Sequence, residues 1–111
     1  MTTPETDMSG GAMKALWRDH VVAEAPDDEL VKVDGAWYFP PTAVDRDLLV
    51  ESPTPYTCSW RGEIQYYSIE ADGEVEPDAA WCYPTMPQEA IDRIGLDARE
   101  YIAFSPAVTL V

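Results

Sequence analysis

The sequence contains few basic residues and only one histidine. Seven Lys and Arg stand against 21 Asp and Glu, which gives a formal net charge of −14. Because proteins neutralise nucleic-acid phosphates with clustered Lys and Arg, this acidic balance disfavours nucleic acid as a partner and predicts a solvated surface. The single histidine, His20, follows Asp19 in a predicted turn, and we expect it to face solvent. It supplies no Ser-His-Asp or Cys-His arrangement, which disfavours a triad hydrolase.

Cysteines and long apolar runs are also scarce. Cys58 and Cys82 are the only cysteines, and they do not form the closely spaced pairs that hold structural zinc. We expect two free thiols, no metal and no cofactor. No apolar run approaches the ~20 residues needed to cross a bilayer, and the first residues do not resemble a secretory signal. These absences predict a cytoplasmic protein with no membrane partner.

The spacing of apolar residues predicts one mainly β domain. Residues 1–12 are rich in Thr, Ser, Gly and Glu and predict a flexible tail, while residues 13–111 form the domain. Within the domain, short apolar runs are separated by turn residues about every 8–12 positions, as in sandwiches and barrels. We expect two packed antiparallel sheets, tent-like or small barrel-like, with one or two short helices.

Turn dipeptides and helix boundaries locate the expected elements. Asp34-Gly35 and Asp72-Gly73 predict hairpin turns, and a third hairpin is expected around Asp19-His20. Helices are expected over 43–49, after two prolines, and over 87–94, closed by glycine. The expected strands cover 14–18, 21–24, 30–33, 36–39, 63–70, 79–83, 101–104 and 108–111.

Two segments, 57–62 and 78–84, contain the residues best suited to chemistry. Cys58 is a candidate catalytic nucleophile because the nearby cation of Arg61 would lower its pKa, although a small buried cysteine is the alternative. Arg61 is suited to hold a carboxylate or phosphate by a planar two-point contact, or else to form a surface salt bridge. On the expected strand, Trp81 and Tyr83 share one face, and Cys82 is expected to point from the other face into the core.

The aromatic residues exceed what a small core needs, so some are expected to line a cavity. Core packing is the alternative for each ring taken singly. A pocket walled by rings, with a few convergent polar groups, is typical of sites for small ligands. The ligand-binding residues that we predict are Tyr38, Thr57, Arg61, Tyr67, Trp81 and Tyr83.

An ordered series of motifs resembles the domain-of-unknown-function 427 family. The motifs are MKALW (13–17), WYFPP (37–41), TCSWRG (57–62), DAAWCYP (78–84) and IAF (102–104). The resemblance implies a small bacterial-type β domain, similar to the tent-like sheet pair of zinc-bearing relatives but without their paired-cysteine metal site. It also implies a nucleotidyltransferase-like label, for which these residues show neither Mg²⁺-holding carboxylates nor a phosphate cradle.

The chain departs from the family pattern at three positions. Ser59 and Arg61 stand where the resemblance implies proline and lysine, and Ala43 stands where it implies a polar residue. A Schiff base or a general-base amine is therefore not available at position 61, so the cation there has to act by charge.

Three functions follow from these observations in order of preference. The first is binding of a small polar or anionic metabolite in an aromatic pocket, with Cys58 as a reactive thiol. The second is a non-catalytic protein-interaction or self-associating module, as a monomer or homodimer. The third is a nucleotidyltransferase-like enzyme.

Overall fold

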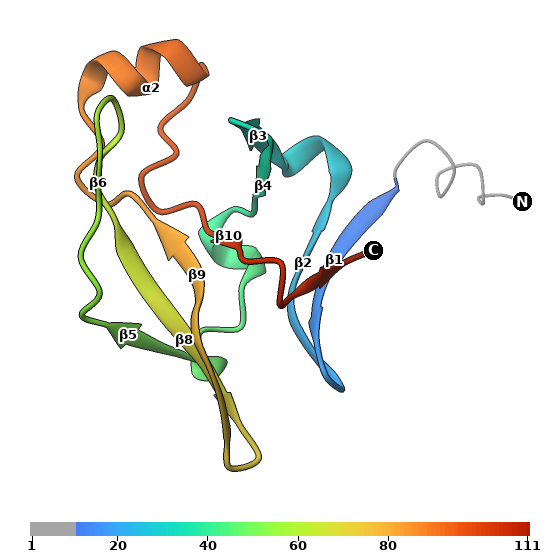
Figure 1. The fold of residues 1–111 in the computed structure, drawn as a ribbon. Coiled ribbons are helices and arrows are strands. Elements are labelled where there is room, and N and C mark those ends of the chain that lie inside the picture. Colours follow the sequence, from blue (N-terminus) through green and yellow to red (C-terminus); the bar gives the residue numbers. More distant parts are fainter. Residues whose placement is uncertain (1–10) are drawn as a thin grey trace, which may run out of the picture.

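The computed structural model describes residues 11–111 and shows a mainly β chain with one α-helix (Figure 1). The helix is α2, Gln88–Ile94. The strands are β1 Ala12–Trp17, β2 His20–Pro26, β3 Val31–Val33, β4 Ala36–Tyr38, β5 Leu49–Ser52, β6 Thr57–Cys58, β7 Gly62–Glu63, β8 Gln65–Ala71, β9 Glu74–Cys82, β10 Ala103–Phe104 and β11 Thr109–Leu110. Residues 1–10 of the predicted tail lie outside the described residues, and Ala12 already begins β1.

Two larger sheets and two small strand pairs make up the fold. One sheet has the order β11-β1-β2 and the other the order β10-β9-β8-β5, while β3-β4 and β6-β7 pair separately. All pairings are antiparallel, which confirms the predicted class. None of the sheets in residues 11–111 closes into a barrel, so the barrel-like alternative is wrong.

Hairpin turns place the strands as the sequence predicts. At Asp34-Gly35 and Asp72-Gly73 both turn residues have positive φ, between 51° and 85°. This is the conformation of a two-residue turn whose twist matches that of the flanking strands. The turn between β1 and β2 lies one residue earlier than expected, because Arg18 takes the positive φ of 55°.

The two predicted helices differ in outcome. The helix over 87–94 is confirmed as α2, and Gly95 ends it with a φ of 100°. The helix over 43–49 is wrong, because that segment forms 3₁₀ turns at Pro41–Ala43 and Arg46–Leu48 and then enters β5. Tertiary pairing explains this difference, since Val44 forms a bridge with Ala23 of β2 and its side chain is buried.

Two hydrophobic clusters fill the interior. The first lies between the two larger sheets and includes Ala15 and Val22 from one sheet with Ile69 and Ala80 from the other. Fully burying one large apolar side chain stabilises the fold by about 1.5–3 kcal/mol. The second cluster joins the β3-β4 hairpin, the end of β9 and α2, and its buried members are Val33, Tyr38, Tyr83, Met86, Ala90, Ile91, Ala98 and Ala103.

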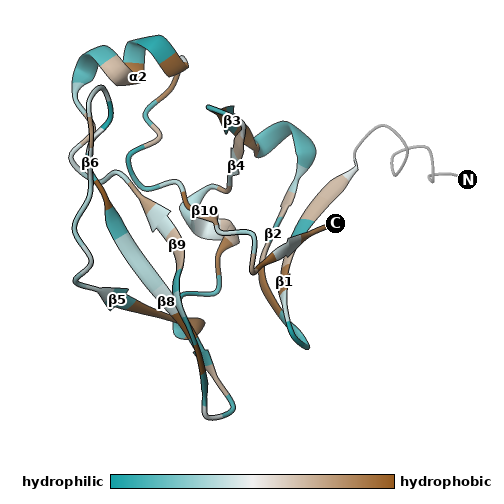
Figure 2. Ribbon diagram, viewed as in Figure 1, coloured by the Kyte–Doolittle hydropathy of each residue, from teal (hydrophilic) through white to brown (hydrophobic). Residues whose placement is uncertain are grey.

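Short elements frame the second cluster. Hydrophilic and hydrophobic segments both occur along α2 (Figure 2), which buries only Ala90 and Ile91. The β3-β4 hairpin is tied to the segment before β10 by a pair of backbone hydrogen bonds between Phe39 and Ile102, 2.8 and 2.9 Å long. These bonds hold β4, which ends at Tyr38, beside β10 (Figure 1).

No helix within residues 11–111 has the length and apolar character needed to cross a membrane.

Candidate ligand pocket

Arg61 lies in the hairpin that joins β6 to β7. Cys58 and Gly62 are partners across this hairpin, and Gly62 has a φ of 91°, a conformation that residues with a Cβ rarely adopt. The short loop therefore turns back sharply and directs the side chain of Arg61 toward the β3-β4 hairpin, where it meets Tyr38.

The Arg61 guanidinium is held by contacts from several parts of the chain. Its Nη1 donates to the hydroxyl of Tyr38 at 2.8 Å, and its Nε donates to the sulfur of Cys58 at 3.4 Å. Its Cζ lies 4.5 Å from the centre of the Tyr83 ring, and its Nη2 lies 3.5 Å from a carboxylate oxygen of Asp34. Only 13% of the side chain is exposed. A cation so enclosed has a fixed orientation and keeps its charge at any working pH.

The hydroxyl of Tyr38 is the polar centre of this arrangement. It accepts one hydrogen bond from Arg61 and a second, 3.1 Å long, from the indole N–H of Trp81. Burial raises the pKa of Tyr38, although its hydrogen bond from Trp81 and the charge of Arg61 oppose the rise. The phenol is thus protonated at neutral pH. With both acceptor sites occupied, its own O–H remains as a hydrogen-bond donor.

A cavity of about 270 Å³ opens at this point. Four of the predicted binding residues, Tyr38, Arg61, Trp81 and Tyr83, line it together. The sequence interpretation missed the other lining residues, which are Val33, Asp34, Ala36, Tyr56, Ile64 and Tyr66. Strand alternation separates Tyr66 from Tyr67, and the position of Tyr66 directly opposite Trp81 in the β8-β9 pairing places it in the cavity. Tyr56 follows two prolines in a loop, and no local pattern indicates its position.

Two predicted binding residues lie elsewhere. Tyr67 is on the opposite face of β8, where its hydroxyl is 3.9 Å from the sulfur of Cys82 in the first hydrophobic cluster. Burial raises the pKa of Tyr67 to about 12, and the neighbouring Cys82 adds to the rise. The prediction for Tyr67 is wrong because adjacent strand residues point to opposite faces. Tyr66, and not Tyr67, therefore lines the cavity. Thr57 is exposed and does not line the cavity; it lines a neighbouring hollow, which shares Tyr56 and Ile64 with the cavity.

The two cysteines differ in environment. Cys82 is buried on the side opposite Trp81, as predicted, and burial raises the pKa of its thiol. Cys58 is half-buried and its sulfur faces Arg61, but it is not among the residues that line the cavity. Burial raises the pKa of Cys58, but hydrogen bonds from the Arg61 side chain and from nearby backbone N–H groups outweigh it, so the net pKa is lowered.

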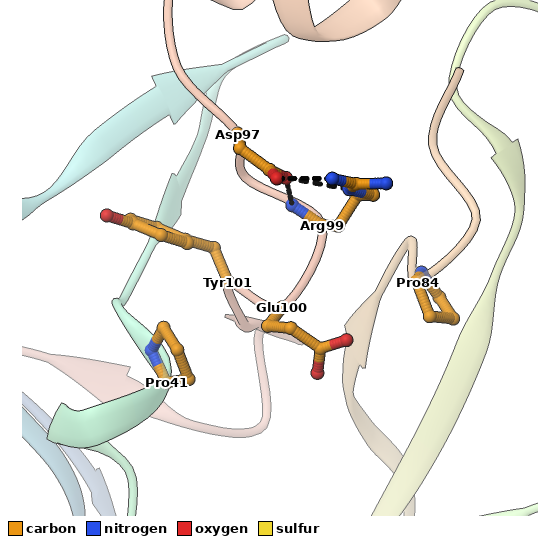
Figure 3. Close-up of a pocket in the computed structure, with 6 residues that line it drawn as sticks. All are labelled: Pro41, Pro84, Asp97, Arg99, Glu100 and Tyr101. Carbon is orange, nitrogen blue, oxygen red and sulfur yellow. Dashed lines mark hydrogen bonds and ion pairs between the residues drawn. The ribbon is translucent and has the colours of Figure 1, made fainter. Parts of the chain in front are cut away.

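A larger hollow of about 440 Å³ lies at another place on the surface (Figure 3). It is lined by Pro41, Pro84, Asp97, Arg99, Glu100 and Tyr101. The one cation among its described lining residues is already paired, because Arg99 donates from Nε and Nη2 to the two carboxylate oxygens of Asp97 (Figure 3). Hydrogen bonds from Arg99 lower the pKa of Asp97 to about 2. The smaller cavity is the better candidate because its hydrogen-bonding groups converge and are mostly buried.

His20 is not the freely exposed turn residue that we expected. It begins β2, and 28% of its side chain is exposed. Its Nε2 lies 2.9 Å from a carboxylate oxygen of Asp72, and its ring stacks on Trp17. The contact joins the ends of the β1-β2 and β8-β9 hairpins, which explains the burial. Within residues 11–111, no three His, Cys, Asp or Glu side chains are grouped so that they could hold a metal ion.

The fold and this cavity define a small, mainly β domain with an aromatic pocket around one enclosed arginine. The family model described as a domain of unknown function (DUF427) matches residues 6–109, and the chain belongs to this family. The match includes segments 57–62 and 78–84, which supply Arg61, Trp81 and Tyr83. No curated protein gives a significant match to the chain.

Proposed function

We propose that this protein binds a small polar or anionic metabolite in the cavity around Arg61. The proposal rests on one observation: the Tyr38 hydroxyl accepts two hydrogen bonds, one from Arg61 and one from Trp81. Because both acceptor sites of the Tyr38 hydroxyl are occupied, its own O–H is left to donate to a ligand in a cavity walled by aromatic rings. Such an arrangement is typical of a site that orients a ligand by few polar contacts.

Arg61 is the one charged hydrogen-bond donor among the described residues that line the cavity. A guanidinium has five N–H groups, and three are directed at Cys58, Tyr38 and Asp34, which leaves two for a ligand. The ligand should therefore carry acceptors, such as the oxygens of a carboxylate or a carbonyl. Its remaining atoms would contact the walls, where Tyr66 and Trp81 meet edge to face with centroids 6.2 Å apart.

The volume limits the size of the ligand. A cavity of about 270 Å³ corresponds to roughly nine water molecules at about 30 Å³ each. This is just below the lower end of the range for drug-sized sites, which begins at about 300 Å³. A metabolite with one ring or a short chain fits, whereas a nucleotide would have to extend well outside the cavity.

Cys58 has a separate role in the proposal. Its sulfur contacts the far side of the guanidinium, so attack on a ligand in the cavity would require Arg61 to move. The proposed function is therefore binding, with the thiol as a reactive group that is tested on its own. Because its pKa is lowered, alkylation of Cys58 by iodoacetamide should reach half of its maximal rate below the pH typical of a free cysteine. A midpoint at or above that pH would remove the nucleophile role and leave binding intact.

A thermal-shift panel of small carboxylates, amides and phenols tests the binding proposal. A true ligand should raise the Tm, and a concentration of 100 times Kd contributes about 2.7 kcal/mol to stability. The shift should vanish in Arg61→Ala and decrease in Tyr38→Phe. The matched control is Arg99→Ala, which removes a cation from the larger hollow and should leave the shift unchanged.

Two outcomes would contradict the proposal. One is a ligand whose stabilisation persists in Arg61→Ala but disappears in Arg99→Ala, which would move the site to the larger hollow. The other is a panel in which no compound stabilises the wild-type protein at millimolar concentration.

The second candidate function is self-association, and one apolar hollow favours it. The hollow lies beside β11, the edge strand of its sheet, and the exposed Leu110 of β11 lines it. Its main apolar lining residues are Trp37, Phe104, Pro106 and Val108. Edge strands present unpaired backbone groups to another chain, so a second copy is the partner that this surface fits. A solution mass of one chain at high protein concentration would reject this alternative, whereas a dimer broken by Leu110→Lys would support it.

Nucleotidyl transfer, which the short name of the family suggests, has the least support. The reaction requires carboxylates that hold Mg²⁺ and donors that surround phosphates. The described lining residues of the cavity contain one acid, Asp34, and one cation, Arg61. These residues do not fit a triphosphate bound with its metal.

A further inference from the structure

Asp34 is the one acidic residue among the described residues that line the cavity. It lies in the β3-β4 turn, with a φ of 51°, and its carboxylate faces the guanidinium of Arg61. The protein therefore places an anion of its own at the entrance to the site that we propose for an anionic ligand.

The two partners of this ion pair are held very differently. Arg61 is only 13% exposed and is fixed by Cys58, Tyr38 and Tyr83. The Asp34 side chain is 55% exposed, and the Nη2 to Oδ2 distance of 3.5 Å exceeds the usual length of about 2.7–2.9 Å for a charged hydrogen bond. Asp34 can rotate into solvent without burying its charge, but Arg61 cannot leave. A second anion could take the place of Asp34 with little rearrangement.

We propose that the ligand is a monocarboxylate and that Asp34 is a competing anion that the ligand displaces from Arg61. This inference rests on the proposed function, because it names the ligand class for the same cavity. One oxygen of the carboxylate would accept from the Nη2 of Arg61 that Asp34 now faces, and the other would accept from the Tyr38 hydroxyl. The exchange keeps one negative charge beside the guanidinium, so no buried cation is left unpaired.

The charges on the cavity wall favour a single negative charge over two. Arg61 is the one cation among the described lining residues, and the cavity has no helix terminus in its wall. Phosphate groups carry more negative charge than the single guanidinium in this wall can neutralise. A carboxylate has one oxygen for the Nη2 of Arg61 and one for the Tyr38 hydroxyl, and its single negative charge matches the single positive charge of Arg61.

The first test compares carboxylates with their own amides. Benzoate, 4-hydroxybenzoate and propionate are titrated by calorimetry beside benzamide, 4-hydroxybenzamide and propionamide, on wild type and on Asp34→Asn. Asparagine is the replacement because it tolerates the positive φ at this turn and removes only the charge. Since an exposed ion pair is weak, Asp34→Asn should tighten carboxylate binding by about two- to five-fold and leave amide binding unchanged. Asp97→Asn is the matched control for net charge and should change neither.

The second test needs no ligand and uses Cys58 as a reporter. Iodoacetate and iodoacetamide are nearly the same size, and both react with the same thiolate, so the ratio of their rates cancels changes in the thiol pKa. Because Cys58 contacts Arg61, this ratio reports how freely the guanidinium attracts an incoming carboxylate. Mass spectrometry of the Cys58 peptide should show a ratio at least about two-fold higher in Asp34→Asn and unchanged in Asp97→Asn.

The outcomes separate this inference from the proposed function. If carboxylates bind with equal affinity to wild type and Asp34→Asn, competition by Asp34 is overturned and binding stands. If only neutral compounds bind, the carboxylate class is overturned and binding again stands. If no compound of either series binds, both proposals fail, whatever the alkylation ratio does.

Discussion

Neighbouring residues of the β8-β9 hairpin lie on opposite faces, and the two faces differ in how deeply they are buried. On one face Tyr67 and Cys82 are buried together in the first hydrophobic cluster. On the other face Tyr66 and Trp81, one residue away on each strand, are half-buried and line the cavity. The same two strands therefore support a closed core on one side and an open pocket on the other.

The difference lies in what covers each face. The Tyr67 side packs against the three-stranded sheet, whose Ala15 and Val22 belong to the same cluster and are fully buried. The Trp81 side meets the short β3-β4 hairpin and the β6-β7 loop, which bring Tyr38 and Arg61. Short elements cover less surface than a sheet, so this face retains a hollow and satisfies its polar groups with each other. We expect the closed face to set stability and the open face to set binding.

Truncation of one large side chain in the closed core should have the largest effect. Ile69 is fully buried between the two larger sheets, so Ile69→Ala should lower the free energy of unfolding by about 2–5 kcal/mol. Tyr66→Ala on the open face should cost clearly less, because that ring is partly in water already. Urea unfolding of both variants measures the difference, and equal losses would contradict the division between the faces.

Removal of the Tyr38 hydroxyl should have the next largest effect. Tyr38→Phe leaves N–H groups of Arg61 and Trp81 without their acceptor, so we expect a loss of about 1–3 kcal/mol in the free energy of unfolding. Tyr66→Phe is the control, since its hydroxyl accepts from neither donor, and it should stay near wild type. A Tyr38→Phe protein as stable as wild type would mean that the network does not hold the pocket together.

Alkaline pH should lower the free energy of unfolding through one tyrosine on each face. Burial raises the pKa of Tyr67 to about 12 and, against the charge of Arg61, also raises the pKa of Tyr83 to about 12. Unfolded tyrosines ionise near pH 10. A folded pKa above the unfolded one contributes stability that is complete below pH 10 and is lost as the pH rises toward 12.

Urea unfolding between pH 9 and 11.5, with tyrosinate absorbance at 295 nm, measures this loss. Tyr67→Phe tests the closed face and Tyr83→Phe the open face, and each should flatten the decline. If only one variant flattens the decline, only the tyrosine on that face has a raised pKa in the folded protein. If neither does, the environments of both rings are less apolar than the structure implies.

Most local structure was predictable from short patterns. The Asp-Gly turns, the glycine that ends α2 and the opposite orientations of Trp81 and Cys82 depend on backbone preferences or on strand alternation. The segment 43–49 was mispredicted because a bridge between Val44 and Ala23 overrides local helix signals. A short stretch of sequence contains no signal for pairing with a residue that is distant in the chain.

The candidate site was predictable only in part. Arg61, Trp81 and Tyr83 come from two motifs that combine charge with aromatic rings, and the structure brings them to one cavity with Tyr38. Tyr67 was preferred to Tyr66, although both faces of that strand carry apolar groups and alternation alone does not say which face is closed. Asp34 was recognised as a turn residue, and its position beside Arg61 depends on how the hairpin docks.

The sequence by itself determined the mainly β class, the turns, the acidic composition and the family, because these depend on residue types and on spacing within short segments. The tertiary structure alone decided which face of β8 and β9 is closed, that Arg61 is enclosed and that Asp34 faces it. Strand alternation assigns side chains to two faces, but only the elements that pack on each face decide how much water it excludes.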